Sequence, residues 1–224
     1  MSLILLLPTI ILTLIHSLRV IRTKWKYIDT VSNQYFEFAT SIIRIICGTE
    51  IYLYSADDIL SSQNIGLIIS NHVSRVDYMF LGFCYGSILK MNARIRVILK
   101  EVFRSIPIFG WAMQIIMFVF ISKNRDKDVP HLKRLISYLY NISGSKLTIL
   151  LFPEGTSLTE NRLAESNAYA TEQHLPQFEF VLHPKPAGFV TCVRSLRGKG
   201  LVLHDITIAY TGYSKGDRPT GRGR

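Results

Sequence analysis

The chain has 224 residues, of which 48% are hydrophobic and 19% are charged. This composition suits one domain of catalytic size with a buried core and excludes a chain that is disordered by composition. Lys and Arg (26) outnumber Asp and Glu (16), and the net charge of +10 favours an anionic partner, which could be a nucleic acid, a phosphorylated substrate or an anionic membrane. Cys47, Cys84 and Cys192 lie far apart. They exclude a disulfide-dense secreted scaffold and a CxxC zinc site, and they favour a reducing compartment.

The first segment, residues 2–18 (SLILLLPTIILTLIHSL), is apolar and carries no formal charge. About 17 residues is the lower limit for a helix that spans a bilayer. Positive charges follow the run at Arg19, Arg22, Lys24 and Lys26, the reverse of the order in a signal peptide. We therefore predict a membrane anchor helix over residues 1–18, with a signal peptide and a buried core helix as alternatives. The basic cluster is expected to keep the rest of the chain on the cytosolic side.

Residues 19–62 are predicted to form a basic juxtamembrane and amphipathic helical segment. Within it, residues 36–54 are apolar but carry charges at Glu37, Arg44 and Glu50. These charges disfavour a membrane span. The pattern is more typical of a helix that lies on the membrane or packs on the domain.

The next part of the chain, residues 63–212, alternates between short apolar runs and helical patterns. Strands are predicted at 65–70, 94–100, 117–121, 147–152, 178–181 and 206–210, and helices at 75–90 and 126–143. This alternation predicts an α/β domain with a mostly parallel sheet flanked by helices. In such sheets ligands bind at the carboxyl ends of the strands. Residues 213–224 are rich in Gly, Arg and Lys and are predicted to form a disordered basic tail.

A first motif, NHVSRVD at residues 71–77, follows the first predicted strand. On one continuous helix His72 and Asp77 would stand about 140° apart, at 100° per residue. If His72 lies in the turn before the helix and Asp77 in its first turns, the carboxylate can reach the imidazole, as in a general base oriented by an acid. Nothing marks Ser74 as a nucleophile. The alternative is a histidine that caps the helix and an ordinary first-turn aspartate.

A second motif, FPEGT at residues 152–156, follows another predicted strand. Pro153 and Gly155 favour a sharp turn that exposes Glu154 and backbone N–H groups. Such N–H groups, with Thr156, can hold a phosphate or a developing oxyanion. The alternative is a plain turn.

A third motif, FISKNR at residues 120–125, places two cations at a strand end. Arg125 could bind a phosphate through two hydrogen bonds, and Lys123 could bind it as a point charge. The alternative is a pair of solvated loop charges.

In chain order, the motifs are His-x4-Asp, then a basic residue after an apolar Phe-Ile strand, then FPEGT. Together they resemble the motifs of the glycerolipid acyltransferases of the 1-acylglycerol-3-phosphate acyltransferase type. The segments IPIFGWA (106–112), LTENRLAESN (158–167), VLHPKPAGF (181–189) and HDITIAY (204–210) look like the lysocardiolipin acyltransferase branch of eukaryotes. The resemblance covers roughly residues 60–212, and the apolar first segment also fits it.

The resemblance implies transfer of a fatty acyl group from acyl-CoA to a free hydroxyl of a lysophospholipid, of the lysophosphatidic acid, lysocardiolipin or lysophosphatidylinositol type. His72 would be the general base and Asp77 its orienting partner. The substrate-binding residues would be Lys123, Arg125, Glu154, Gly155 and Thr156.

The sequence departs from the family pattern at two of these positions. Lys123 stands where Arg is usual, which keeps the positive charge but loses the paired N–H donors of a guanidinium. Tyr78 stands where Trp is usual. Pro184 and Gly188 lie in a weaker fourth motif and are expected to shape the site.

The resemblance further implies an enzyme of phospholipid biosynthesis and remodelling in the endoplasmic reticulum membrane, with its active site facing the cytosol. Acyl-CoA would be a co-substrate, and no cofactor is expected. We expect no metal because the thioester is already activated, although His72, Asp77 and Glu154 could ligate one. Family members of this branch continue beyond the last predicted strand and carry more membrane segments, so we expect this chain to be a fragment or a short isoform.

Two other classes of function stay open at this point. A hydrolase could use His72 and Asp77 with water, and a membrane-bound lipid-binding or scaffold protein could retain the motifs without turnover. Nucleic-acid binding is disfavoured because the basic residues are not interleaved with aromatic residues in any recognisable module.

Overall fold

The structure is a computed structural model that describes residues 24–54, 65–88, 94–122 and 124–211. The predicted anchor at residues 1–18, Lys123 and the predicted tail at 213–224 lie outside the described residues. Among the helices that are described, none is both long enough and apolar enough to cross a membrane.

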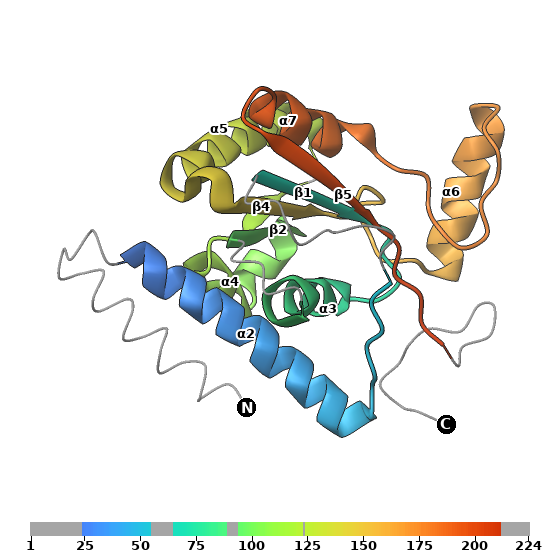
Figure 1. Ribbon diagram of the computed structural model, residues 1–224. Coiled ribbons are helices and arrows are strands. Elements are labelled where there is room, and N and C mark those ends of the chain that lie inside the picture. The colour runs from blue at the N-terminus through green and yellow to red at the C-terminus, as the bar shows by residue number, and fades with distance from the viewer. Residues whose placement is uncertain (1–23, 55–64, 89–93, 123, 212–224) are drawn as a thin grey trace.

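The centre of the domain is one sheet of five strands in the order β3-β2-β4-β1-β5, and every neighbouring pair is parallel (Figure 1). The strands are β1 (Ile65–Ser70), β2 (Arg94–Lys100), β3 (Val119–Ile121), β4 (Leu147–Leu151) and β5 (Leu201–Ile206). The predicted α/β class with a parallel sheet is therefore confirmed. All carboxyl ends of the strands meet at one edge of the sheet, where ligands bind in folds of this kind.

Helices cover both faces of this sheet (Figure 1). On one face lie α2 (Lys24–Cys47), α3 (Asp77–Phe83) and α4 (Phe109–Ile115), and on the other lie α5 (Arg125–Ser143) and α7 (Pro186–Leu196). A further helix, α6 (Glu160–Glu172), stands beyond the carboxyl ends of the strands. Short helical turns complete the fold: η2 (Cys84–Ile88), η3 (Glu101–Ser105) and η4 (Gly144–Lys146).

The core consists of two apolar layers that alternate along the strands. In β1, Ile68 packs toward α2 and α3, and its neighbour Leu67 packs toward α5 and α7. In β4, Leu150 and Ile149 divide in the same way. Because both faces are covered, β1 and β4 are mostly apolar along their length rather than alternating with polar residues.

Helix α2 replaces the helix that the sequence predicts over residues 36–54. It begins at Lys24 and ends at Cys47, before Gly48, whose φ of 60° favours glycine at a helix end. Tyr35 and Phe36 are buried against α3, and the Thr40 hydroxyl donates to the Met79 carbonyl at 3.2 Å. The sequence predicted a helix that lies on the membrane or packs on the domain, and the structure shows α2 packed on the domain.

Two predicted strands are wrong. Residues 178–181 form no strand, because the Asn167 side chain instead bonds both the N–H and the carbonyl of Phe178, at 3.0 and 2.8 Å. The last strand lies at Leu201–Ile206 rather than at 206–210. Past Ile206 the chain leaves the sheet, since the Asn71 side chain binds the backbone of Ile208.

The other predicted elements are near the observed ones. The predicted helix at 75–90 corresponds to α3 followed by η2, and the one at 126–143 corresponds to α5. The strand predicted at 117–121 is shortened to Val119–Ile121 because Met117 has a φ of 60°. Helices α4, α6 and α7 were not predicted.

Ile108, just before α4, is in a strained backbone conformation. Its φ and ψ are 67° and −60°, and the Phe109 N–H donates to the Pro107 carbonyl at 2.7 Å, which makes a γ-turn centred on a β-branched residue. Ile108→Gly should therefore cost about 1–3 kcal/mol less free energy of unfolding than the same change at an unstrained, similarly exposed isoleucine, because it relieves strain of that size. Urea denaturation measures the change.

The matched control is Ile106→Gly. Ile106 is similarly exposed but has an ordinary φ of −72°, so the same change should lower stability. Equal loss of stability in both variants would contradict the strain.

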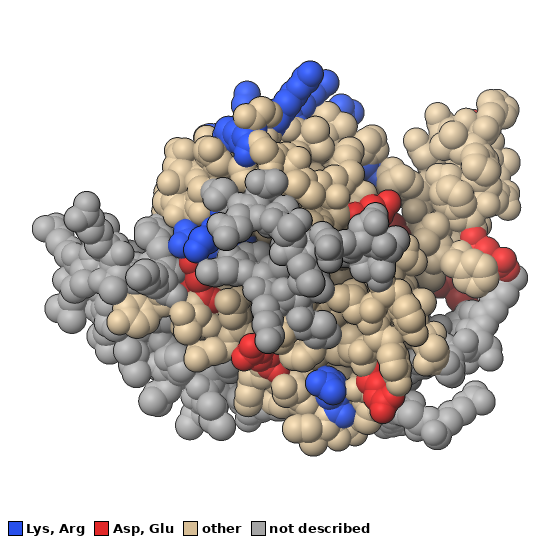
Figure 2. All heavy atoms as spheres, viewed as in Figure 1, with Lys and Arg blue, Asp and Glu red and all other residues tan. Residues whose placement is uncertain are grey.

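Basic side chains are unevenly distributed on the surface. Lys and Arg gather over α5 and α7, at the top of the view in Figure 2. This charge lies on the face of the sheet opposite α2 and α3.

Candidate active site

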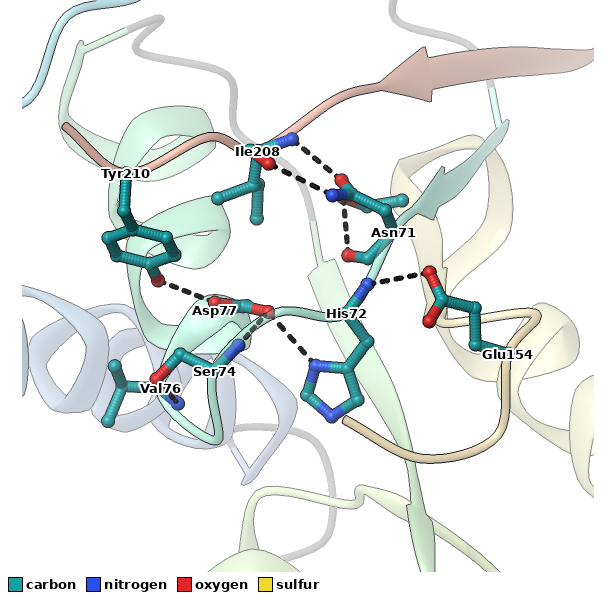
Figure 3. A network of polar contacts seen from close by, with 9 residues as sticks. Asn71, His72, Ser74, Val76, Asp77, Glu154, Ile208 and Tyr210 are labelled. Carbon is teal, nitrogen blue, oxygen red and sulfur yellow. Dashed lines mark hydrogen bonds and ion pairs between the residues drawn. The ribbon is translucent and has the colours of Figure 1, made fainter. Parts of the chain in front are cut away.

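His72 and Asp77 are in contact at the carboxyl edge of the sheet (Figure 3). His72 lies two residues after β1, and Asp77 is the first residue of α3. The His72 Nδ1 is 3.0 Å from the Asp77 Oδ2, and the two side chains are 18% and 0% exposed. The turn between strand and helix thus brings the side chains together, as the sequence predicts. With Nδ1 donating to the carboxylate, a neutral imidazole has its lone pair on Nε2.

The buried Asp77 carboxylate accepts hydrogen bonds from three directions. Its Oδ2 accepts from the Ser74 N–H at 2.9 Å as well as from His72. Its Oδ1 accepts from the Tyr210 hydroxyl at 2.5 Å. These donors fix the orientation of the carboxylate and compensate for its removal from water. Ser74 contributes its backbone, while its hydroxyl accepts from the Val76 N–H, so it acts as a turn residue.

Two further contacts fix the position of His72. The Asn71 side chain donates to the Ile208 carbonyl at 2.9 Å and accepts from the Ile208 N–H at 2.7 Å, which ties the segment after β1 to the segment after β5. The imidazole stacks on the Phe152 ring, with 4.2 Å between centroids and 20° between planes. Asn71 and Phe152 therefore restrict the movement of His72.

Glu154 lies beside His72 on the turn after β4 (Figure 3). Its Oε1 accepts from the His72 N–H at 3.1 Å, and its side chain is only 5% exposed. Among the described residues, none forms a hydrogen bond with its buried Oε2. Burial raises the pKa of Glu154 above the ordinary value, although the hydrogen bond from the His72 N–H lowers it. The carboxyl therefore keeps its proton to higher pH than an exposed glutamate does, and Oε2 can either donate to or accept from a bound hydroxyl.

Gly155 and Thr156 complete this turn. The Gly155 N–H donates to the Phe152 carbonyl at 3.0 Å, so this N–H is used inside the turn rather than offered to an oxyanion. Gly155 has a φ of 70°, a conformation that favours glycine. The Thr156 hydroxyl accepts from the Lys100 Nζ at 2.8 Å, which places a cation from the end of β2 at the site.

A cavity of about 930 Å³ adjoins the site. Glu154 and Thr156 line it, and so does Arg125, the first residue of α5. The structure thus brings three of the predicted binding residues to one cavity. Lys123, the other cation predicted at this site, lies outside the described residues.

Sequence reasoning did not identify Tyr210, Asn71, Phe152 or Lys100 as site residues. Tyr210 ends the apolar run ITIAY, and Lys100 ends the alternating run RIRVILK. A polar residue at the carboxyl end of a predicted strand is the signal that could have pointed to both.

The arrangement is suited to general base chemistry. An oriented imidazole with an available Nε2 can take a proton from a hydroxyl, while the carboxylate stabilises the imidazolium. No serine, threonine or cysteine side chain is shown hydrogen-bonded to His72 within the described ranges. The described part of the chain also contains no group of three or more His, Cys, Asp or Glu side chains placed to hold a metal ion.

Comparisons with known proteins agree with this geometry. The family described as Acyltransferase matches residues 51–210. The chain is 34% identical over 191 residues to "Lysocardiolipin acyltransferase 1" of Danio rerio, covering 84% of this chain and 48% of that protein. It is 31% identical over 161 residues to "Probable 1-acyl-sn-glycerol-3-phosphate acyltransferase 5" of Arabidopsis thaliana, covering 70% of this chain and 41% of that protein.

A third relative is "Lysophosphatidylinositol acyltransferase 10" of Caenorhabditis elegans, 28% identical over 194 residues, with coverage of 84% of this chain and 48% of that protein. The chain spans less than half the length of these relatives. No solved structure gives a significant match. The match over residues 51–210 includes β1 to β5 and the contact between His72 and Asp77, and it shows that the chain belongs to the acyltransferase family.

Proposed function

We propose that this chain carries a membrane-bound O-acyltransferase that moves a fatty acyl group from acyl-CoA to a free hydroxyl of a lysophospholipid. The observation that carries the proposal is the 3.0 Å contact between His72 Nδ1 and Asp77 Oδ2 at the carboxyl edge of the sheet. It leaves Nε2 as the basic atom. Glu154, which accepts from the His72 backbone N–H, has a buried Oε2 without a hydrogen-bond partner among the described residues.

The proposed reaction has four parts. The Nε2 of His72 takes the proton of the acceptor hydroxyl as its oxygen attacks the thioester carbonyl carbon. Asp77 stabilises the imidazolium that results. The carbon–sulfur bond of the tetrahedral intermediate then breaks. The leaving CoA sulfur takes the proton from His72, which restores the neutral imidazole and yields the ester and free CoA.

The class of acceptor follows from the relatives and from charge. Relatives are named for acyl transfer to lysocardiolipin, 1-acyl-sn-glycerol-3-phosphate and lysophosphatidylinositol, all of them anionic lysophospholipids. The net charge of +10 favours both these lipids and acyl-CoA. Such an enzyme is expected at the endoplasmic reticulum membrane with its site facing the cytosol.

An apolar surface next to the site supports membrane association. Val102, Ile106 and Trp111 are 67%, 42% and 59% exposed, in the segment that follows Lys100 at the end of β2. The Lys100 side chain binds Thr156, so this surface adjoins the candidate site. We propose that it contacts the bilayer from which the acceptor comes. Flotation with vesicles of phosphatidylcholine and phosphatidylserine tests this, and protein that stays at the bottom of the gradient would contradict it.

The experiment that tests the function is product analysis by mass spectrometry. Purified protein is given a panel of lysophospholipids and acyl-CoA. The expected product is the lysophospholipid with one added acyl chain. Free fatty acid as the main product would instead favour the hydrolase, and no turnover at all would favour a lipid-binding protein.

A further inference from the structure

The cavity beside Glu154 extends well beyond the residues that the proposed mechanism uses. Its walls come from the start of α5, from α6, from the segment between α6 and α7, and from α7. Its volume of about 930 Å³ is in the upper part of the usual range for small-molecule sites and exceeds what a single phosphate needs. His72 does not line it, so the cavity lies beyond Glu154 as seen from the imidazole.

Cations without ion pairs line this cavity. Within the described residues, no ion pair or side-chain hydrogen bond is formed by Arg125, Lys185 or Arg194. The fourth cation, Arg162, is paired with Glu165 at 2.7 Å. Apart from Glu154 and the paired Glu165, the only carboxylate among the described residues that line the cavity is Asp126. The three unpaired cations therefore exceed the unpaired carboxylates. The balance favours a polyanionic group over a neutral one.

Lys185 connects the far part of the cavity with the turn that carries Glu154. Its backbone N–H donates to the Pro153 carbonyl at 2.8 Å. Its Cδ lies 3.7 Å from the point that a Cβ on Gly155 would occupy, so the side chain passes over the turn. A ligand on Lys185 is thus adjacent to the turn that carries Glu154.

We propose that Lys185 and Arg194 form a phosphoryl-binding subsite in this cavity, separate from the residues that surround His72. The inference rests on the proposed function and extends it, because it assigns a place for a phosphate that is remote from the reacting hydroxyl. Two sources have this chemistry: the headgroup phosphate of the lysophospholipid and the phosphates of CoA. Arg offers a fork of donors to such a group and Lys a mobile point charge.

Binding without turnover tests the subsite. Isothermal titration calorimetry with the full chain is done with two soluble probes, coenzyme A and glycerophosphoglycerol, and with glycerol as the unphosphorylated control. The double variant Lys185→Gln/Arg194→Gln should bind one of the two phosphorylated probes at least about tenfold more weakly, because it lacks two charge-assisted hydrogen bonds. The probe that loses affinity identifies the source of the phosphate.

The matched control is the double variant Lys133→Gln/Arg134→Gln. These two side chains are exposed on α5, do not line the cavity, and carry the same total charge. This control should stay within about twofold of the unmodified chain, because a remote surface charge acts only weakly through screening. Restoring charge with Lys185→Arg/Arg194→Lys should recover binding, which separates a lost contact from a folding defect.

The outcomes separate this inference from the function on which it rests. Unchanged binding of both probes in the Lys185/Arg194 variant, or equal losses in the control, would overturn the subsite even if acyl transfer is observed. Weakened binding together with an absence of acyl transfer would support the subsite and contradict the proposed function.

Discussion

Replacing His72 with Ala is expected to lower kcat for acyl transfer by about 10²- to 10⁴-fold, the range that a positioned general base contributes. The change removes Nε2, the atom that takes the proton of the acceptor hydroxyl. It leaves the backbone N–H that donates to Glu154, so the turn after β1 should persist. Initial rates at saturating acceptor and acyl-CoA measure the effect.

His131→Ala serves as the control for this variant. His131 lies on α5, is half-buried and does not line the cavity, so the same substitution should leave kcat unchanged. Equal activity in His72→Ala and in the unmodified chain would refute the assignment of the base.

Replacing Asp77 with Asn should lower kcat by about 10²-fold or more, because a neutral amide no longer stabilises the imidazolium. Asn has nearly the same shape and can still accept from the Ser74 N–H, and the Tyr210 hydroxyl can turn to accept from an amide. Asp77→Ala would be a poorer test, since it leaves buried donors without partners and costs about 1–3 kcal/mol of stability. Rates and urea denaturation are measured on the same preparation.

Asp128→Asn is the matched control. Asp128 is also in the first turn of a helix and accepts two hydrogen bonds from Ser122, but it is half-buried rather than fully buried and lies outside the cavity. The Asp128→Asn variant should change the free energy of unfolding slightly and leave kcat unchanged. A loss of activity in Asp77→Asn that parallels its loss of folded protein would assign Asp77 a structural role only.

Local patterns were sufficient to predict the central strands. The strands β1 and β2 have the predicted bounds, because Ile65–Ser70 is an apolar run, Arg94–Lys100 is an alternating run, and both end at a polar residue. The contact between His72 and Asp77 was also predictable, since it spans five residues across one strand-to-helix turn. Where a short apolar run lacked such an end, as at residues 178–181, periodicity did not distinguish a strand from a loop whose backbone binds Asn167.

Contacts between distant parts of the chain were beyond the reach of such patterns. The bond between Tyr210 and Asp77 joins residues 133 positions apart, and it exists only because β5 pairs with β1. The same holds for Asp29 of α2, which pairs with Arg94 at 2.6 Å and with the buried Arg96 at 2.7 Å. The strand order determines these neighbours, and a single sequence does not give the strand order.

His72 is expected to activate the hydroxyl of a lipid acceptor rather than water. The most direct measurement is the rate of CoA release from acyl-CoA by the purified chain, with and without lysophospholipid. The account predicts release that rises at least about tenfold with acceptor and that falls to the level without acceptor in His72→Ala. Release at the same rate whether or not the lysophospholipid is present would contradict it.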